Sequence, residues 1–229
     1  DLWDLFQQNV SEKQIFIYLH DEDLEALVKE QGWSGHVRVA EGNDFFNDYL
    51  FVVDANLASL KSDPAVLRAI DYSVRNDKEK GLIARLSYTW DNTGKLDFFR
   101  TRYHDYMRVL VPEGSQLLSI EGNDTDVDTT QEWGKAVFGT YKTTEVQTTE
   151  TVTFEYQLPE KILDDWESKG YTLLVQKQGG AQAHQLRVTL DLGRPVDNYW
   201  PFENAAVTGN SITWTTTLDQ DKKFTILSD

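Results

Sequence analysis

Apolar and polar residues alternate along most of the chain with the two-residue period that is typical of half-buried β-strands. In residues 81–90 every second position is apolar, and the turn residues Asp91-Asn92-Thr93-Gly94 follow. The same pattern, separated by turn residues, predicts further strands at 70–75, 106–111, 115–120, 135–141, 149–158, 171–177, 184–192, 211–217 and 223–227. Many short strands at this spacing, with Thr-rich polar faces, are typical of antiparallel sheets in a sandwich.

The first 66 residues follow a different pattern. Helical spacing predicts helices over 2–10 and 21–31, the second capped by Asp21, and mostly apolar runs predict strands over 13–19 and 48–54. Later in the chain only 160–169 reads as a helix. We therefore predict an α+β, mostly β chain. An N-terminal helix and strand segment over residues 1–66, the tail of a domain begun upstream, precedes an antiparallel, immunoglobulin-like β-sandwich over 67–229.

Charge and composition exclude several functions. The chain has 22 Lys and Arg against 38 Asp and Glu, a formal net charge of −16 in 229 residues. Nucleic-acid phosphates and anionic lipid attract clustered Lys and Arg, so we expect no nucleic-acid partner and poor binding to an anionic membrane surface. The absence of Cys excludes thiol catalysis and Cys-ligated metals. No apolar stretch approaches the ~20 residues of a membrane span, so we expect this part of the protein not to be membrane-inserted.

Several motifs resemble, in order and spacing, a bacterial domain-of-unknown-function family, family 4012. They are Lys13-Gln14-Ile15-Phe16-Ile17-Tyr18-Leu19, Gly32-Trp33-Ser34-Gly35, Val52-Val53-Asp54-Ala55-Asn56-Leu57-Ala58, Tyr106-Met107-Arg108-Val109-Leu110-Val111-Pro112, Gly134-Lys135-Ala136-Val137-Phe138-Gly139, Phe154-Glu155-Tyr156-Gln157-Leu158-Pro159 and Leu173-Leu174-Val175-Gln176-Lys177-Gln178. The chain departs from the family where Gly179-Gly180 replaces an expected Pro-Gly, and we interpret this pair as a hairpin turn.

The resemblance covers about residues 13–191 and the C-terminal half of the family. It implies a membrane-anchored protein whose large domain lies outside the cytoplasm, with the anchor upstream of this chain. The expected location is thus the extracellular face of the bacterial membrane or the cell surface. The family brings no catalytic residues to carry over.

Alternating carboxylates make Asp124, Asp126 and Asp128 a calcium candidate, because hard oxygen ligands suit that ion. An EF-hand would continue with Gly and then Glu, whereas Thr129 and Lys135 stand at those positions. A solvated acidic loop is the simpler interpretation. Apart from calcium, the sequence predicts no cofactor.

A second candidate is the polar loop that follows the 48–54 strand. Asn56, Lys61, Asp63 and Arg68 lie there. These residue types serve ordinary turn chemistry, in which Asn and Asp bond nearby backbone groups, and they also line ligand clefts. We also expect Arg108, within an apolar strand, to pair with Asp105.

Two functions follow from these observations. The first is a non-enzymatic structural or interaction module, because no catalytic motif is found and the sandwich pattern dominates. The second is a carbohydrate-binding or envelope-polymer-processing domain that uses acids and exposed aromatics such as Trp33, Trp133 and Trp200. The corresponding partner is a cell-envelope protein or a glycan.

Overall fold

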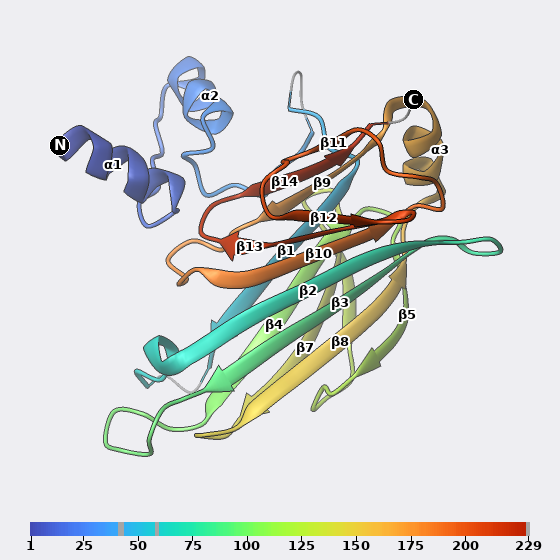
Figure 1. Ribbon diagram of the computed structural model, residues 1–229. Helices are drawn as coiled ribbons and strands as arrows, with labels where there is room; N and C mark the ends of the chain where they lie inside the picture. The colour runs from blue at the N-terminus through green and yellow to red at the C-terminus, as the bar shows by residue number, and fades with distance from the viewer. Residues whose placement is uncertain (41–43, 58–59, 228–229) are drawn as a thin grey trace.

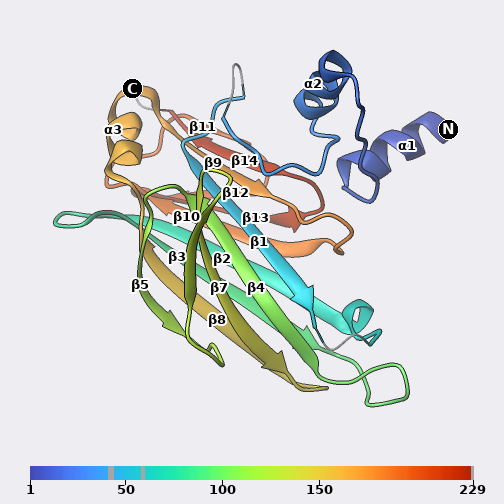
Figure 2. The same cartoon turned by 180° about the vertical axis from the view of Figure 1, so that it is seen from behind.

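The computed structural model describes residues 1–40, 44–57 and 60–227, whose strands form two facing seven-stranded sheets (Figures 1 and 2). The first sheet contains, in spatial order, β11 (Tyr199–Trp200), β14 (Lys222–Ile226), β9 (Tyr171–Gln176), β1 (Asp48–Asn56), β4 (Tyr103–Pro112), β7 (Lys135–Thr144) and β6 (Asp128–Glu132). The second contains β12 (Ala205–Thr208), β13 (Ser211–Leu218), β10 (His184–Asp191), β2 (Val66–Asp77), β3 (Gly81–Asn92), β8 (Thr149–Gln157) and β5 (Gln116–Glu121). The prediction of a mostly β, sandwich-like chain is confirmed.

Both sheets are mixed, and the prediction of wholly antiparallel sheets is wrong. β1 runs parallel to β9, and β2 runs parallel to β10. The side-chain alternation of a strand reports which face is buried but not the direction of its neighbour, so the pattern could not reveal these pairs. Gly179-Gly180 forms a turn, but this turn joins β9 of the first sheet to β10 of the second and closes no hairpin.

Inward-facing apolar side chains from both sheets form one large core. The alternation of residues 81–90 is confirmed, since Leu82, Ala84, Leu86, Tyr88 and Trp90 are all buried. Burial of such side chains supplies the main free energy of folding. The helix α3 (Glu160–Lys169), also expected, packs against β3 and β9 and buries Ile162 and Trp166.

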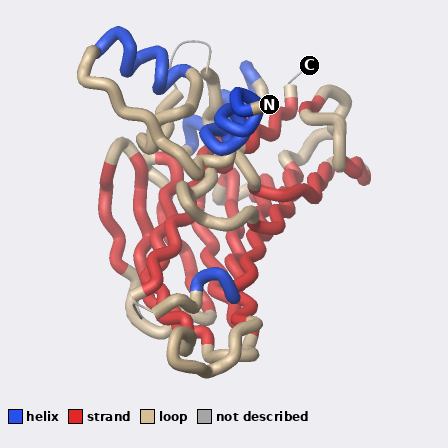
Figure 3. The backbone as a smooth tube through the Cα atoms, turned by 90° about the vertical axis from the view of Figure 1, so that its left-hand side faces the viewer, coloured by secondary structure: helices blue, strands red, loops and turns tan. Residues whose placement is uncertain are grey.

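The sandwich begins before the predicted boundary at residue 66. β1 lies between β9 and β4 at the centre of the first sheet, so the end of segment 1–66 belongs to the sandwich. Its apolar run Tyr49–Val53 fits a central strand that is covered on both faces. Residues 1–47 contain helices α1 (Leu2–Ser11) and α2 (Glu22–Glu30), which lie beside one end of the sandwich (Figure 3).

Residues 13–19 do not form the predicted strand. Lys13 takes a φ of 58°, and the N–H of Ile17 donates to the carbonyl of Trp33 (3.0 Å). The segment lies on the sandwich through the ring of Phe16, which covers Gly179 so closely that a Cβ there would lie 2.2 Å from it. A side chain at position 179 would therefore require the Phe16 ring to move.

Polar contacts reinforce the same attachment. The N–H of Gly180 donates to the carbonyl of Lys13 (2.9 Å), and the buried Lys13 ammonium pairs with Asp221 (2.7 Å). In the parts of the chain that the structure describes, no helix is both long and apolar enough to cross a membrane.

Candidate functional site: a buried acidic network

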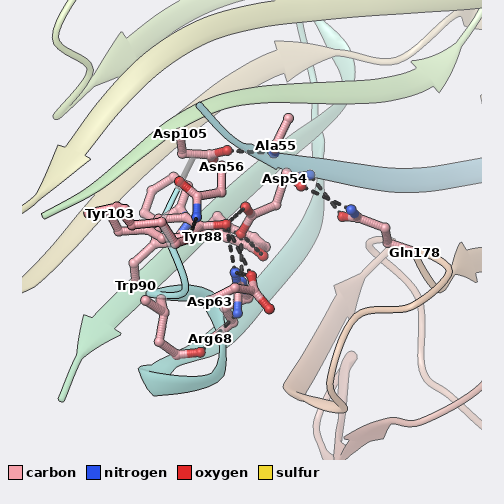
Figure 4. Close-up of polar contacts among 12 residues, drawn as sticks. Asp54, Ala55, Asn56, Asp63, Arg68, Tyr88, Trp90, Tyr103, Asp105 and Gln178 are labelled. Atoms are coloured by element: carbon pink, nitrogen blue, oxygen red, sulfur yellow. Dashed lines mark hydrogen bonds and ion pairs between the residues drawn. The ribbon is translucent and has the colours of Figure 1, made fainter. Parts of the chain in front are cut away.

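Asp54, near the end of β1, points into the sandwich and is the centre of a buried polar network (Figure 4). One carboxylate oxygen accepts hydrogen bonds from Arg68 Nε (2.6 Å), Trp90 Nε1 (3.1 Å) and the Tyr88 hydroxyl (3.2 Å). The Tyr103 hydroxyl donates to the other oxygen. The side chain of Asp54 is 3% exposed. Four donors from three strands therefore enclose one carboxylate away from solvent.

Arg68, on β2, supplies the only formal positive charge among these donors. Its guanidinium also contacts Asp63 (2.5 Å), the carbonyl of Val66 (2.8 Å) and the Tyr103 hydroxyl (2.8 Å). Burial disfavours the ionised form of Asp54, but the adjacent Arg68 charge and the hydrogen bonds outweigh it and lower the Asp54 pKa. Asp54 and Arg68 therefore form a buried ion pair that joins the two sheets.

A second carboxyl group, Asp105 on β4, lies beside the pair. One of its oxygens accepts the N–H of Ala55 (2.6 Å), and the other is buried with no hydrogen-bond partner among the described residues. Burial and then the negative charge of Asp54 raise the Asp105 pKa. Two neighbouring buried carboxylates repel each other, so Asp105 holds a proton while Asp54 stays ionised.

Asp48, at the start of β1, forms a similar network without a contacting cation. It accepts hydrogen bonds from the Tyr72 hydroxyl (2.7 Å), the Tyr171 hydroxyl and the N–H of Tyr49 (2.7 Å). Burial raises the Asp48 pKa to about 6, against opposing effects of these donors and of the more distant Lys135 charge. Through Tyr72 of β2, this carboxyl group also joins the two sheets.

Access decides what these acids can do chemically. A cavity of about 290 Å³ beside the network is lined by Arg68 and His184 but by neither Asp54 nor Asp105. His184 is itself buried, and burial lowers its pKa to about 4, so its ring is neutral at pH 7. A carboxyl pair can act as acid and base only where a substrate reaches both groups. Through its bond to Arg68, Asp54 bridges the two sheets.

The structure brings together two of the four residues predicted in the polar loop. Arg68 and Asp63 form an ion pair, but the Asn56 amide donates to the carbonyl of Leu60 (3.2 Å), and Lys61 lies over the Phe99 ring (5.7 Å). Arg68 lines one cavity and Lys61 lines another. Sequence reasoning missed Asp54, although its position, two and four residues after the inward-facing Val52 and Leu50, was a usable signal.

The three calcium candidates are not brought together. Asp124 pairs with Lys142 (3.2 Å), Asp128 accepts from the Tyr106 hydroxyl (3.2 Å), and Asp126 is exposed. Within the described ranges, no group of three or more His, Asp or Glu side chains could hold a metal ion. The reason is that Asp128 already belongs to β6, while Asp124 bonds to β7.

Arg108 does not pair with Asp105 as expected. Its guanidinium contacts Glu132 (2.5 Å), at the end of β6 in the same sheet, and lies over the Trp133 ring (5.7 Å). Arg108 and Asp105 stand three positions apart on β4, so their side chains leave opposite faces of the strand.

Comparisons with known proteins show which solved structures share this fold. No family model matches the chain, and no curated protein matches it. A Legionella pneumophila subsp. pneumophila str. Philadelphia 1 protein, described as a candidate nutrient-binding protein, aligns over 80% of this chain and 72% of its own, with a TM-score of 0.50 and 8% identity. That likeness shows a shared fold alone.

Two other solved structures match more remotely. They are leukotriene A4 hydrolase from Saccharomyces cerevisiae (TM-score 0.40, 9% identity, 71% of this chain and 28% of that one) and an M1 zinc metallopeptidase from Deinococcus radiodurans (TM-score 0.35, 14% identity, 76% and 44%). The chain spans less than half the length of either enzyme.

Proposed function

We propose that this chain is a non-enzymatic interaction module of a bacterial surface protein, displayed outside the cell membrane, and that residues 1–31 carry its binding surface. One observation carries the proposal: α1 and α2 turn apolar side chains to solvent. Of the apolar residues on these helices, only Val10 and Val28 are buried. The buried acids support a non-enzymatic role, because Asp54 and Asp48 are already engaged in bridging the sheets.

The exposed apolar surface of this segment is extensive. Leu2 is 83% exposed and Tyr18 is 72% exposed. The other large apolar side chains exposed there are Trp3, Leu5, Ile15, Phe16, Leu19, Leu24 and Leu27. A monomeric protein rarely leaves so many apolar side chains of one segment in water, and such surfaces commonly mark binding sites.

Charge indicates the chemistry of the partner. Residues 1–31 contain eight Asp and Glu but two Lys. A matching partner presents an apolar surface with Lys or Arg at its rim, since opposite potentials across an interface favour association. A cell-envelope protein with such a basic, apolar surface fits this description.

Site-specific photo-crosslinking in cells that produce the full-length protein tests the proposal. A photoreactive residue at exposed Leu24 should give one discrete adduct with a second protein, and Leu27→Ser should weaken that adduct. The matched control carries the photoreactive residue at Arg85, exposed on the outer face of β3. No adduct at Leu24, equal adducts at both positions, or an adduct within the same polypeptide would contradict the proposal.

A cavity beside an exposed tryptophan favours glycan binding as a second candidate function. Trp200, Glu203 and Asn204 are among the residues that line this cavity of about 280 Å³. Trp200 is 55% exposed, and an aromatic face beside amide and carboxylate groups suits a sugar ring. The Legionella protein of similar fold, described as nutrient-binding, is compatible with this alternative.

A glycan array followed by calorimetry separates the two candidates. If the cavity binds a sugar, Trp200→Ala should abolish the signal, whereas Trp133→Ala should not. Trp133 is the appropriate control because it is 59% exposed but lies beside Arg108, away from this cavity. Absence of any array signal for the wild-type chain would remove the alternative.

Membership of family 4012, the immunoglobulin-like description and the extracellular location stay predictions. They are supported by the ordered motifs and by the sandwich-like arrangement of strands. A protease-accessibility measurement on intact bacteria carrying the full-length protein tests the location, since only an exposed domain is cleaved.

A further inference from the structure

Two loops form a tip at the end of the sandwich away from α1 and α2 (Figures 1 and 2). One loop joins β3 to β4 (93–102), and the other follows β1 (described at 57 and 60–61). The N–H of Lys61 donates to the carbonyl of Phe99 (2.8 Å) and joins the two loops, and the N–H of Leu57 donates to the carbonyl of His104 on β4 (2.7 Å). We call this pair of loops the loop tip.

The backbone of the longer loop is held in a defined turn. The Asp97 carboxylate accepts the N–H groups of Phe99 and Arg100, both at 2.8 Å. The N–H of Asp97 donates to the carbonyl of Arg100 (3.1 Å). Such a side-chain cap fixes a short turn and keeps Phe98, at its centre, projecting outward.

Large apolar side chains cover the loop tip. Phe98 is 87% exposed, Leu96 is 72% exposed and Phe99 is 56% exposed. Leu57 and Leu60 of the shorter loop are 49% and 42% exposed.

Basic residues surround these side chains. The described parts of the two loops contain Lys61, Lys95, Arg100 and Arg102, and the one acid there, Asp97, lies 3.4 Å from Arg100. Arg102 faces Glu145 of the neighbouring loop at 3.4 Å. The loop tip thus carries a local positive charge in a chain whose net charge is −16.

We propose that the loop tip contacts a phospholipid bilayer, with Leu96, Phe98 and Phe99 entering the interface and the basic residues meeting anionic headgroups. Aromatic and Leu side chains backed by Lys and Arg are the composition that binds at this depth. A bilayer fits better than a protein partner because the apolar residues lie on a projecting turn, which a soft interface accepts without a preformed pocket.

The charge of the whole chain opposes this contact but does not decide it. At physiological salt a charge is screened beyond ~8 Å, so acids distant from the loop tip contribute little at the membrane surface. The net charge predicts poor binding to an anionic membrane, and this prediction applies to the surface outside the loop tip. The contact rests on residues outside the proposed protein-binding segment, so either proposal can fail alone.

Vesicle co-sedimentation of the full chain tests the proposal, with phosphatidylcholine alone and with one quarter phosphatidylglycerol. The wild-type chain should bind, and more strongly to the anionic vesicles. F98S/F99S should lower the partition coefficient about tenfold or more, because two apolar side chains no longer leave water. K61Q/K95Q should reduce binding several-fold on anionic vesicles and leave binding to neutral vesicles unchanged.

Phe202→Ser is the matched control, since Phe202 is 68% exposed but lies elsewhere in the chain. It should bind vesicles like the wild type, and thermal unfolding should show that all variants are folded. The proposal fails if the wild-type chain binds neither vesicle, if F98S/F99S binds normally, or if F202S is equally impaired. Phe98-dependent binding to an envelope protein without lipid would also overturn it.

Discussion

Asp48 and Asp54 stand six residues apart on one strand, both point into the core, and both join the two sheets, yet their environments differ in one respect. Asp54 contacts the guanidinium of Arg68, whereas Asp48 contacts hydroxyl and backbone donors alone. The Asp54 pKa is lowered and the Asp48 pKa is raised to about 6. At Asp48 the hydrogen bonds do not offset the effect of burial on the pKa, whereas at Asp54 the added charge of Arg68 does.

The two sites therefore affect stability with opposite signs of pH dependence. Asp54, with a lowered pKa, contributes stability above its unfolded pKa of 3.8, and this contribution is lost as the pH falls. Asp48 keeps its proton in the fold up to about pH 6, while the unfolded chain releases it near 3.8. Its effect therefore destabilises the fold progressively between about pH 4 and pH 6 and remains constant above.

The largest expected effect comes from removing the cation. Arg68→Met should lower the free energy of unfolding at pH 7 by about 3–5 kcal/mol, because an ionised Asp54 is left buried without its partner. Urea unfolding measures this. The control is Arg187→Met on β10 of the same sheet, an exposed arginine 3.8 Å from Asp71, expected to change stability by at most about 0.5 kcal/mol. Equal effects of the two variants would contradict the comparison.

Asp105→Asn should stabilise the protein at pH 7 by at most about 4 kcal/mol, since this pH lies about three units above the unfolded pKa and each unit corresponds to 1.36 kcal/mol. Burial and Asp54 raise the Asp105 pKa, so the fold retains a proton that the unfolded chain loses near pH 4, and stability falls as the pH rises above that value. Asparagine is neutral at every pH and removes this slope. Urea unfolding between pH 4 and 8 should show a flatter profile for the variant. A loss of stability at pH 7 would mean that Asp105 is ionised in the fold.

Asp48→Asn tests the site without a cation. Between about pH 4 and pH 6 it should remove a destabilisation of at most about 3 kcal/mol, since each pKa unit corresponds to 1.36 kcal/mol. His184 has a lowered pKa, so it destabilises the fold as the pH falls below 6.5. This contribution is the same in both proteins, so it cancels when the free energy of unfolding of the wild type is subtracted from that of the variant. A difference that does not change with pH would contradict the raised pKa.

Removing one hydroxyl from each site tests single hydrogen bonds to the two carboxylates. Tyr171→Phe should cost about 2 kcal/mol at pH 7, and less at pH 5, where Asp48 is protonated. Tyr103→Phe should cost about 1 kcal/mol, because Asp54 keeps Arg68, Tyr88 and Trp90. Thermal and urea unfolding at both pH values measure the pair. A larger loss for Tyr103→Phe would reverse the ranking of the two sites.

Local patterns predicted most strands and the three α-helices of the described residues, because periodicity depends on neighbouring residues. Asp21 caps α2 as expected, through the N–H of Leu24 (3.1 Å). The prediction of a strand at 13–19 was wrong because a strand requires a partner. The apolar residues of this segment instead cover Gly179 or remain exposed. A sequence pattern shows which residues prefer an extended backbone but not whether a second strand lies beside them.

The candidate site was predicted less well for a related reason. Asp63 and Arg68 were predicted as part of a polar loop, and they form an ion pair. The central carboxylate of the network, Asp54, lies instead in an apolar strand. Asp54, Tyr103 and Asp105 come from two neighbouring strands whose register is set by long-range pairing. Only tertiary structure distinguishes an acid that faces solvent from one that faces an arginine across a sandwich.

The parallel pairs β1–β9 and β2–β10 have a consequence for synthesis on the ribosome. Asp48 pairs with Leu173, and Ala69 pairs with Gln185, so in both pairs the second residue is synthesised more than a hundred residues after the first. At typical elongation rates the central strand β1 has one unpaired edge for roughly ten seconds, longer than most small domains need to fold. Since open strand edges recruit other strands, we expect the nascent chain to depend on chaperones during this interval.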